Sequence, residues 1–271
     1  MKYALTYHHT TFEKDMFDEV IIKYNEINLH VVKFAQEKAK NVRLVLNVSE
    51  YKDDIEDTLD IIKQVASVHP AVAILLSLSQ ADFGKKLQDA GIRFFYDKIA
   101  ETWDELLSLV YAGVSDIYVG SELGFEIKDV ASVCHSRNIR VRVYPNVAQT
   151  SAPFQNLPVI TSFFIRPEDL KLYEDYVDII QFFGPLDRQR VLHQIYDRGS
   201  WMGKVSEIII GGQELTLLNE AITSRFGAAR LNCKKKCNQH KCELCNNAKI
   251  FAEALTEQGL VLKTKEREKN V

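Results

Sequence analysis

The stretch TWDELLSLVYAGVSDIYVG, residues 102–120, contains one complete helix-to-strand unit. Thr102, followed three positions later by Glu105, forms a capping box that starts a helix, and Gly113 is a typical helix end. Residues 116–120, DIYVG, then form a short, mostly apolar run. Strands that are buried on both faces of a parallel sheet have this composition. The stretch therefore predicts a helix over residues 102–113 and a buried strand directly after it.

The same unit repeats along the chain and predicts the fold. Eight β-rich runs occupy residues 42–48, 71–79, 92–98, 116–120, 140–146, 162–167, 178–184 and 207–212. Stretches of helical period lie between them, at residues 57–68, 102–113, 127–138, 168–176 and 186–199. Eight alternating strand–helix units predict an α/β fold of the (β/α)8 TIM-like barrel type. A doubly wound open sheet is the alternative.

The first forty residues carry two further β-rich runs, KYALTYHH and DEVIIKYN, and then a helical stretch. The two runs either form a hairpin that closes the bottom of the barrel, as an N-terminal β extension, or the second run is itself the first barrel strand. A chain of 271 residues suits one barrel domain. We expect that domain to span residues 1–271, with the extension at 1–40 and a Cys-rich metal loop at 228–250.

Composition and charge exclude some classes of protein. The chain is 46% hydrophobic and 26% charged, with a formal net charge of −3. This weak net charge argues against a globally basic nucleic-acid binder, although a local basic patch remains open. No run approaches the length of a membrane span, and the N-terminus lacks the apolar core of a signal peptide. We therefore expect a cytoplasmic protein without a membrane partner.

Polar side chains follow most of the predicted strands, where the active sites of barrels lie. Asp97 and Glu122 are candidate catalytic carboxylates for acid–base chemistry. Arg166 is a candidate to hold a phosphate or carboxylate group of a substrate. The full set of candidates at the strand ends is Asn47, Ser77, Asp97, Glu122, Asn146, Arg166, Gln181 and Gln213.

The end of the last predicted strand carries a possible cofactor contact. Gly211 and Gly212 would let a phosphate approach backbone N–H groups, and Asn146 is a further candidate cofactor-binding residue. The chain contains no Walker A loop, no G-x-G-x-x-G, no G-x-S-x-G elbow and no H-E-x-x-H. The well-known phosphate, nucleophile and zinc-protease motifs therefore do not identify the chemistry.

Four of the five cysteines lie close together, in the spacing C-x3-C-x4-C-x2-C. In a reducing compartment such a cluster indicates a metal site rather than disulfides. Four thiolates suit tetrahedral zinc, while the x4 and x2 spacings also match a plant-type iron–sulfur pattern. Zinc and an iron–sulfur cluster both remain open. The expected ligands are Cys233, Cys237, Cys242 and Cys245.

The stretch AGVSDIYVGSELGFEIKDVASVCHSRNIRVRVYPNV, residues 112–147, resembles the collagenase-like peptidase family, also called peptidase family U-32. The resemblance implies a TIM-like barrel and oxygen-independent hydroxylation of RNA bases or quinones, with an iron–sulfur cluster held by four cysteines. The features that carry it are Gly113, Asp116, Tyr118, Val119, Gly120, His135 and Asn146.

Two departures separate this chain from that family pattern. The family spreads its cysteines over the chain, whereas here all four lie between residues 233 and 245. The stretch GGQELTLLNE, residues 211–220, also lacks the family's cysteine signature. Two hypotheses follow. The first is an enzyme that modifies a nucleobase or similar substrate. The second is a non-catalytic barrel with structural zinc that binds protein or nucleic acid through the basic residues 234–241.

Overall fold

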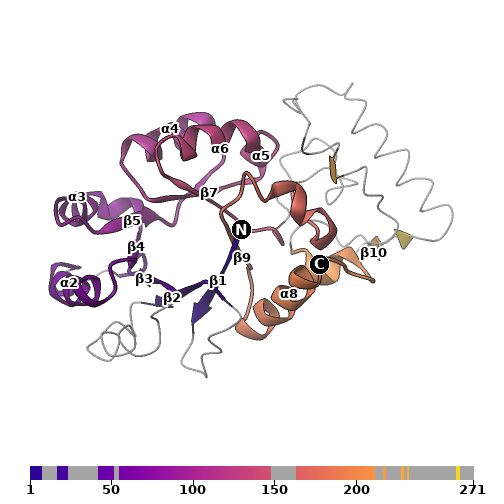
Figure 1. Ribbon diagram of the computed structural model, residues 1–271, viewed down its shortest axis with the longest axis horizontal. Coiled ribbons are helices and arrows are strands. Elements are labelled where there is room, and N and C mark those ends of the chain that lie inside the picture. Colours follow the sequence, from indigo (N-terminus) through magenta and orange to yellow (C-terminus); the bar gives the residue numbers. More distant parts are fainter. Residues whose placement is uncertain are drawn as a thin grey trace, which may run out of the picture.

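In the computed structural model, residues 1–7, 17–23, 42–51, 55–147 and 163–210 are described, together with 216–217, 227–228, 231 and 261–262. Within these residues one sheet of nine strands has the order β5-β4-β3-β2-β1-β9-β8-β7-β6 (Figure 1). Every pairing in it is parallel. The strands are β1 Lys2–Tyr7, β2 Glu19–Lys23, β3 Arg43–Asn47, β4 Ala73–Leu76, β5 Arg93–Tyr96, β6 Ile99–Ala100, β7 Asp116–Val119, β8 Arg140–Val143 and β9 Ile179–Gln181.

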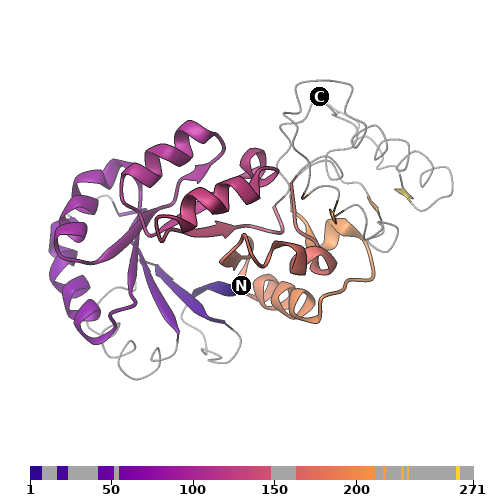
Figure 2. The same cartoon turned by 45° about the horizontal axis from the view of Figure 1, so that its top comes forward.

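Helices connect the strands and cover the outer side of the sheet (Figures 1 and 2). They are η2 Ile55–Thr58, α2 Leu59–Val68, η3 Leu78–Gln80, α3 Ala81–Asp89, α4 Trp103–Tyr111, α5 Ser121–Gly124, α6 Ile127–His135, η4 Pro167–Tyr173, α8 Leu186–Arg198 and α9 Val205–Ile208. A short antiparallel pair, β10 Thr216–Leu217 and β11 Val261–Leu262, is separate from the main sheet. None of the helices in the described ranges combines the length and apolar character that crossing a membrane requires.

The sheet curls in the manner of a TIM barrel, so each strand has an inner and an outer face. On β5, Phe94 and Tyr96 approach Gly84 of α3 and therefore lie on the outer, helix-covered face. Phe95 lies on the inner face, beneath the guanidinium of Arg142 from β8. The N–H group of Ser115, just before β7, donates to the carbonyl of Phe94 at 2.8 Å. The curl therefore brings β5 next to the start of β7.

Most of the predicted elements are confirmed. Strands occur within residues 42–48, 71–79, 92–98, 116–120, 140–146 and 178–184, and helices within 57–68, 102–113, 127–138 and 186–199. The predicted capping box is present: Thr102 accepts from the N–H of Glu105, and Glu105 accepts from the N–H of Thr102. Gly113 has a φ of 73°, the left-handed conformation expected after a helix.

Two predicted strands are wrong. Residues 207–212 were expected to form a strand, but Glu207 accepts from the N–H of Lys204 and helix α9 runs to Ile208. Among residues 207–210, the described part of this run, Ile210 alone pairs in parallel, as an isolated bridge to Val147. In the predicted strand at residues 162–167, the N–H of Ile165 donates to the carbonyl of Pro145 outside any named strand. The segment predicted as a helix at 168–176 is the 3-10 helix η4.

The N-terminal β extension is also wrong. β1 pairs in parallel with both β2 and β9, so it lies in the middle of the main sheet. A hairpin would require β1 and β2 to run antiparallel. Both early runs are therefore strands of the curled sheet, and the strand numbering shifts accordingly. The α/β class and the TIM-barrel-like curl are confirmed, while a single domain over residues 1–271 stays a prediction.

Candidate functional site at the carboxyl end of the sheet

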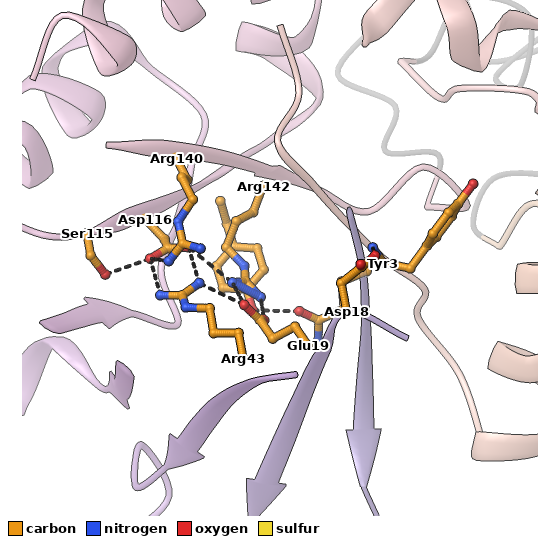
Figure 3. A network of polar contacts seen from close by, with 10 residues as sticks. Tyr3, Asp18, Glu19, Arg43, Ser115, Asp116, Arg140 and Arg142 are labelled. Carbon is orange, nitrogen blue, oxygen red and sulfur yellow. Dashed lines mark hydrogen bonds and ion pairs between the residues drawn. The ribbon is translucent and has the colours of Figure 1, made fainter. Parts of the chain in front are cut away.

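The inner face at the amino end of the strands holds a network of charged side chains (Figure 3). Arg43 of β3 pairs with Glu19 of β2 at 2.7 Å and makes a bidentate contact with Asp116 of β7, both distances 2.9 Å. Arg142 of β8 pairs with Glu19 and also with Asp116, the latter at 3.2 Å. Arg140 reaches Asp116 at 3.1 Å. Five side chains from four strands thus bind one another inside the curl.

Most side chains of this network are buried. The side chains of Glu19, Asp116 and Arg142 are at most 2% exposed, whereas that of Arg140 is 27% exposed. Burial would raise the pKa of Asp116, but the guanidinium of Arg43, helped by Arg142 and Arg140, holds it well below its usual range. The carboxylate is therefore fully ionised and engaged with the protein itself. The members of this network are therefore bound mainly to one another.

Aromatic side chains connect this network to the other end of the strands. The Arg142 guanidinium lies over the rings of Phe95 and Tyr118, at 4.7 and 5.2 Å from their centroids. Tyr118 stacks on Tyr144 with ring centroids 5.2 Å apart and an interplanar angle of 5°. The Tyr118 hydroxyl donates to Gln181 of β9 at 2.7 Å. Buried rings therefore fill the middle of the inner face.

Asp97 lies at the carboxyl end, directly after β5, and its side chain is exposed. Partial burial of the carboxyl raises the pKa of Asp97, a hydrogen bond with Ser49 opposes this shift, and Glu50 adds to it. The Ser49 hydroxyl also donates to Asn47 Oδ1 at 2.8 Å, and the Ser49 N–H reaches the same oxygen at 3.0 Å. If Ser49 gives its one proton to Asn47, its oxygen can accept a proton from Asp97. Ser49 can therefore meet either protonation state of Asp97: its hydrogen bond to the carboxylate favours the ionised form, while burial favours the protonated form.

Glu101 is a second carboxyl group at this end, and the sequence analysis missed it. Glu101 accepts from the N–H of Glu122 at 3.1 Å. Burial raises the pKa of Glu101, the hydrogen bond from the Glu122 N–H lowers it, and the Glu122 charge raises it again. A Cβ at Gly120 would overlap the Glu101 carboxyl group, so the glycine leaves room for this group in its present position. A glycine at the end of β7 was the one available signal.

The three predicted catalytic residues have different surroundings. The side chains of Asp97 and Glu122 are exposed, and no described hydrogen bond or ion pair joins them. Arg166 is buried and makes a bidentate ion pair with Asp169, at 2.6 and 2.9 Å. Asp97 is exposed, and partial burial of its carboxyl group raises its pKa. Catalytic roles for Glu122 and Arg166 stay predictions.

Of the predicted cofactor-binding residues, Asn146 lies within the part of the chain that the structure describes. Asn146 is buried, and its side-chain amide binds the backbone of Phe183 at both ends, at 2.9 Å each. The described residues contain no group of three or more side chains suited to a metal ion. Outside the described residues lie Gly211, Gly212, Cys233, Cys237, Cys242 and Cys245, so the metal and phosphate predictions stay untested.

Comparisons with known proteins assign no activity. No family model matches the chain, and no curated protein matches it. Among solved structures, it is similar to the 4-hydroxy-2-oxoglutarate aldolase/2-deydro-3-deoxyphosphogluconate aldolase from TTHB1, with 11% identity, 73% of this chain and 93% of that chain covered, and a TM-score of 0.42. A designed cube-shaped, highly porous protein cage matches with 12% identity, 96% and 77% coverage, and a TM-score of 0.44. Gox0644 at apoform matches with 11% identity, 89% and 92% coverage, and a TM-score of 0.39.

Proposed function

We propose that the protein is an enzyme whose active site lies at the carboxyl end of the sheet and that Asp97 exchanges a proton with the substrate. The observation that carries this proposal is the place of Asp97, exposed at the carboxyl end of the sheet beside Ser49, which Asn47 holds, with partial burial raising the pKa of its carboxyl group. A carboxyl group tuned in this way works as an acid or base closer to neutral pH than an ordinary aspartate. Its exposure leaves it accessible to a substrate.

The residues around Asp97 have complementary roles in this proposal. Ser49, held by Asn47, orients the carboxyl group of Asp97. Its hydroxyl donates a hydrogen bond to the ionised carboxylate or accepts one from the protonated carboxyl group. Glu101 is the second proton-exchanging group, because burial also raises its pKa. Two carboxyl groups with raised pKa values allow one to remove a proton from a substrate while the other returns one.

The resemblance of residues 112–147 narrows the proposed reaction to hydroxylation or a related modification of a nucleobase or quinone. In this version Cys233, Cys237, Cys242 and Cys245 hold the metal centre. Four thiolates are a donor set that suits an iron–sulfur cluster as well as zinc. When bound, an iron–sulfur cluster supplies electron transfer, and the residues of the carboxyl end bind the substrate and move protons.

Two measurements test this proposal. The first is the metal content and visible absorption of protein purified without air, where iron, sulfide and a brown colour are expected. The second is mass spectrometry of RNA nucleosides and quinones from cells that carry the wild type, Asp97→Asn or the control Asp89→Asn, whose side chain is exposed on α3. We expect one hydroxylated product to be lost in Asp97→Asn and kept in the control. Identical profiles in all three cell types would overturn the enzyme proposal.

The second candidate is a non-catalytic barrel that has a structural zinc site and binds protein or nucleic acid. The observation that favours it is that two of the predicted site residues, Arg166 and Asn146, have partners inside the protein. The proposed contact surface is the basic segment Lys234, Lys235, Lys236 and Lys241. A colourless protein with one equivalent of zinc and unchanged metabolite profiles would support this candidate. RNA binding that survives charge reversal of all four lysines would exclude its nucleic-acid version.

A further inference from the structure

Phe183, which follows β9, has a backbone that is fixed while its side chain is open. Its N–H donates to Asn146 Oδ1, and its carbonyl accepts from Asn146 Nδ2, each at 2.9 Å. Asn146 is completely buried, whereas Phe183 is 56% exposed. The effect of the Asn146 amide is to hold an exposed aromatic residue in one place.

The ring of Phe183 stands at the carboxyl end of the inner face. Side chains alternate along the chain here: Phe182 packs outward against Tyr196 of α8, at 4.9 Å between centroids, while Phe183 contacts Tyr144. The rings of Phe183 and Tyr144 are perpendicular, at 83° with centroids 6.3 Å apart. Tyr144 can therefore cover at most one face of the Phe183 ring. Phe183 is 56% exposed, so part of its surface is open to a ligand.

The neighbouring hydroxyl groups determine what such a ligand must offer. Tyr118 gives its single proton to Gln181, so its oxygen accepts the hydrogen bond that joins it to Tyr144. Tyr144 thereby uses its own proton, and its oxygen can only accept from the site. A ligand beside Tyr144 is therefore recognised through an N–H or O–H group.

We propose that Phe183 is the ring-stacking, specificity-determining residue of this site. The substrate class is then a planar ring that carries an N–H or O–H group, which stacks on Phe183 and donates to Tyr144. Asn146 is the positioning residue for Phe183. This inference rests on the proposed function, because it places the platform in the site that contains Asp97.

A matched pair of probes isolates the planar ring. Benzamide and cyclohexanecarboxamide carry the same amide group on six-membered rings, but only benzamide is flat. Ligand-observed NMR titration gives the dissociation constant of each with the full-length protein. We expect the wild type to prefer benzamide by about 5-fold, as one aromatic stacking contact provides. F183L should reduce this preference to about 1-fold, and F183W should restore it.

Asn146→Ala tests the positioning role. We expect N146A to lose the preference for benzamide while its affinity for cyclohexanecarboxamide is kept, a pattern that general destabilisation would not produce. Tyr111→Leu is the matched control, because Tyr111 is 74% exposed on α4, which covers the outer side of the sheet, and should keep the preference. Thermal melting by circular dichroism confirms that each variant is folded at the titration temperature.

Two outcomes would overturn this inference: no preference for benzamide in the wild type, or an unchanged preference in F183L. The result is separable from the enzyme proposal, because benzamide binding requires no turnover. A Phe183-dependent preference together with unchanged products in Asp97→Asn cells would overturn the enzyme proposal alone. Loss of a product in those cells, with no effect of F183L on the preference, would overturn the stacking platform alone.

Discussion

The two ends of the sheet's inner face use the same strands for opposite purposes. β7 contributes Asp116 to the closed ion network, then Tyr118 to the buried rings, and is followed by Gly120, which makes room for Glu101. At the amino end, neighbouring guanidiniums lower the pKa of a buried carboxyl group, Asp116. At the carboxyl end, burial without a cationic partner among its main influences raises the pKa of Asp97. We therefore assign stability to the amino end of the strands and the proposed activity to their carboxyl end.

The largest effect is expected from removing a negative charge at the amino end. Glu19→Gln leaves three guanidiniums facing Asp116 as their remaining carboxylate in the network. An uncompensated buried charge costs about 3–5 kcal/mol, so the free energy of unfolding should fall by that amount. Urea unfolding of E19Q measures it, with Glu50→Gln, an exposed position, as the control. A loss no greater than that of the control would show that the network does not stabilise the fold.

Charge balance sharpens this comparison. Adding Arg142→Met to Glu19→Gln leaves two guanidiniums, Arg43 and Arg140, with one carboxylate, Asp116, so the excess of one positive charge is the same as in the wild-type network. We expect the double variant to lose less stability than the sum of the single variants, with a coupling of about 1–3 kcal/mol. A double-mutant cycle in urea gives the coupling. Strict additivity would mean that Arg142 and Glu19 do not act as a pair.

The amino end should also determine how the protein responds to acid. The pKa of Asp116 is lower in the folded protein than its unfolded value of about 3.9. Its contribution to stability is therefore complete above that value and is lost as the pH falls toward the folded pKa. The difference in unfolding free energy between wild type and Asp116→Asn should narrow below about pH 4. A difference that stays constant between pH 7 and pH 3 would contradict this assignment.

The smallest loss of stability among these substitutions is expected near the carboxyl end of the sheet, at Thr102, the N-cap residue of α4. Thr102 accepts from the N–H of Glu105 at the start of α4. Thr102→Ala removes this acceptor and should cost about 1 kcal/mol, whereas Thr102→Ser keeps it and should cost much less. Thermal and urea unfolding compare the two variants. Equal losses would show that the hydroxyl group of the cap is not what stabilises α4.

Local signals in the sequence were sufficient for much of the fold. The capping box at Thr102 and the apolar strands depend on residues a few positions apart, so composition and period predict them. The wrong strand at 207–212 has apolar, β-branched residues, but the contact between Glu207 and the backbone of Lys204 forms a helical turn instead. Local composition alone does not determine the state of such a short run.

Long-range contacts explain what the sequence did not reveal about the site. Arg142 and Glu19 lie 123 positions apart, and the Asn146 contact to Phe183 spans 37 positions. Nothing in the local pattern indicates that these side chains meet. Asp97 was predicted from its place after a strand, whereas Glu101 follows the short strand β6, which the sequence analysis did not identify. The sequence thus predicted that the site lies at the carboxyl end, but only the tertiary structure shows which side chains contact one another there.

The most direct test of the division between the two ends is one substitution made at both. Asp116→Asn and Asp97→Asn remove the same charge from the amino and carboxyl ends, and urea unfolding at pH 7 measures each. We predict a loss of about 3–5 kcal/mol for D116N, because it leaves buried guanidiniums unpaired. For D97N we predict a small gain, within about 0.5 kcal/mol, because the folded state disfavours ionisation of this carboxyl group. Equal losses at both positions would contradict the account.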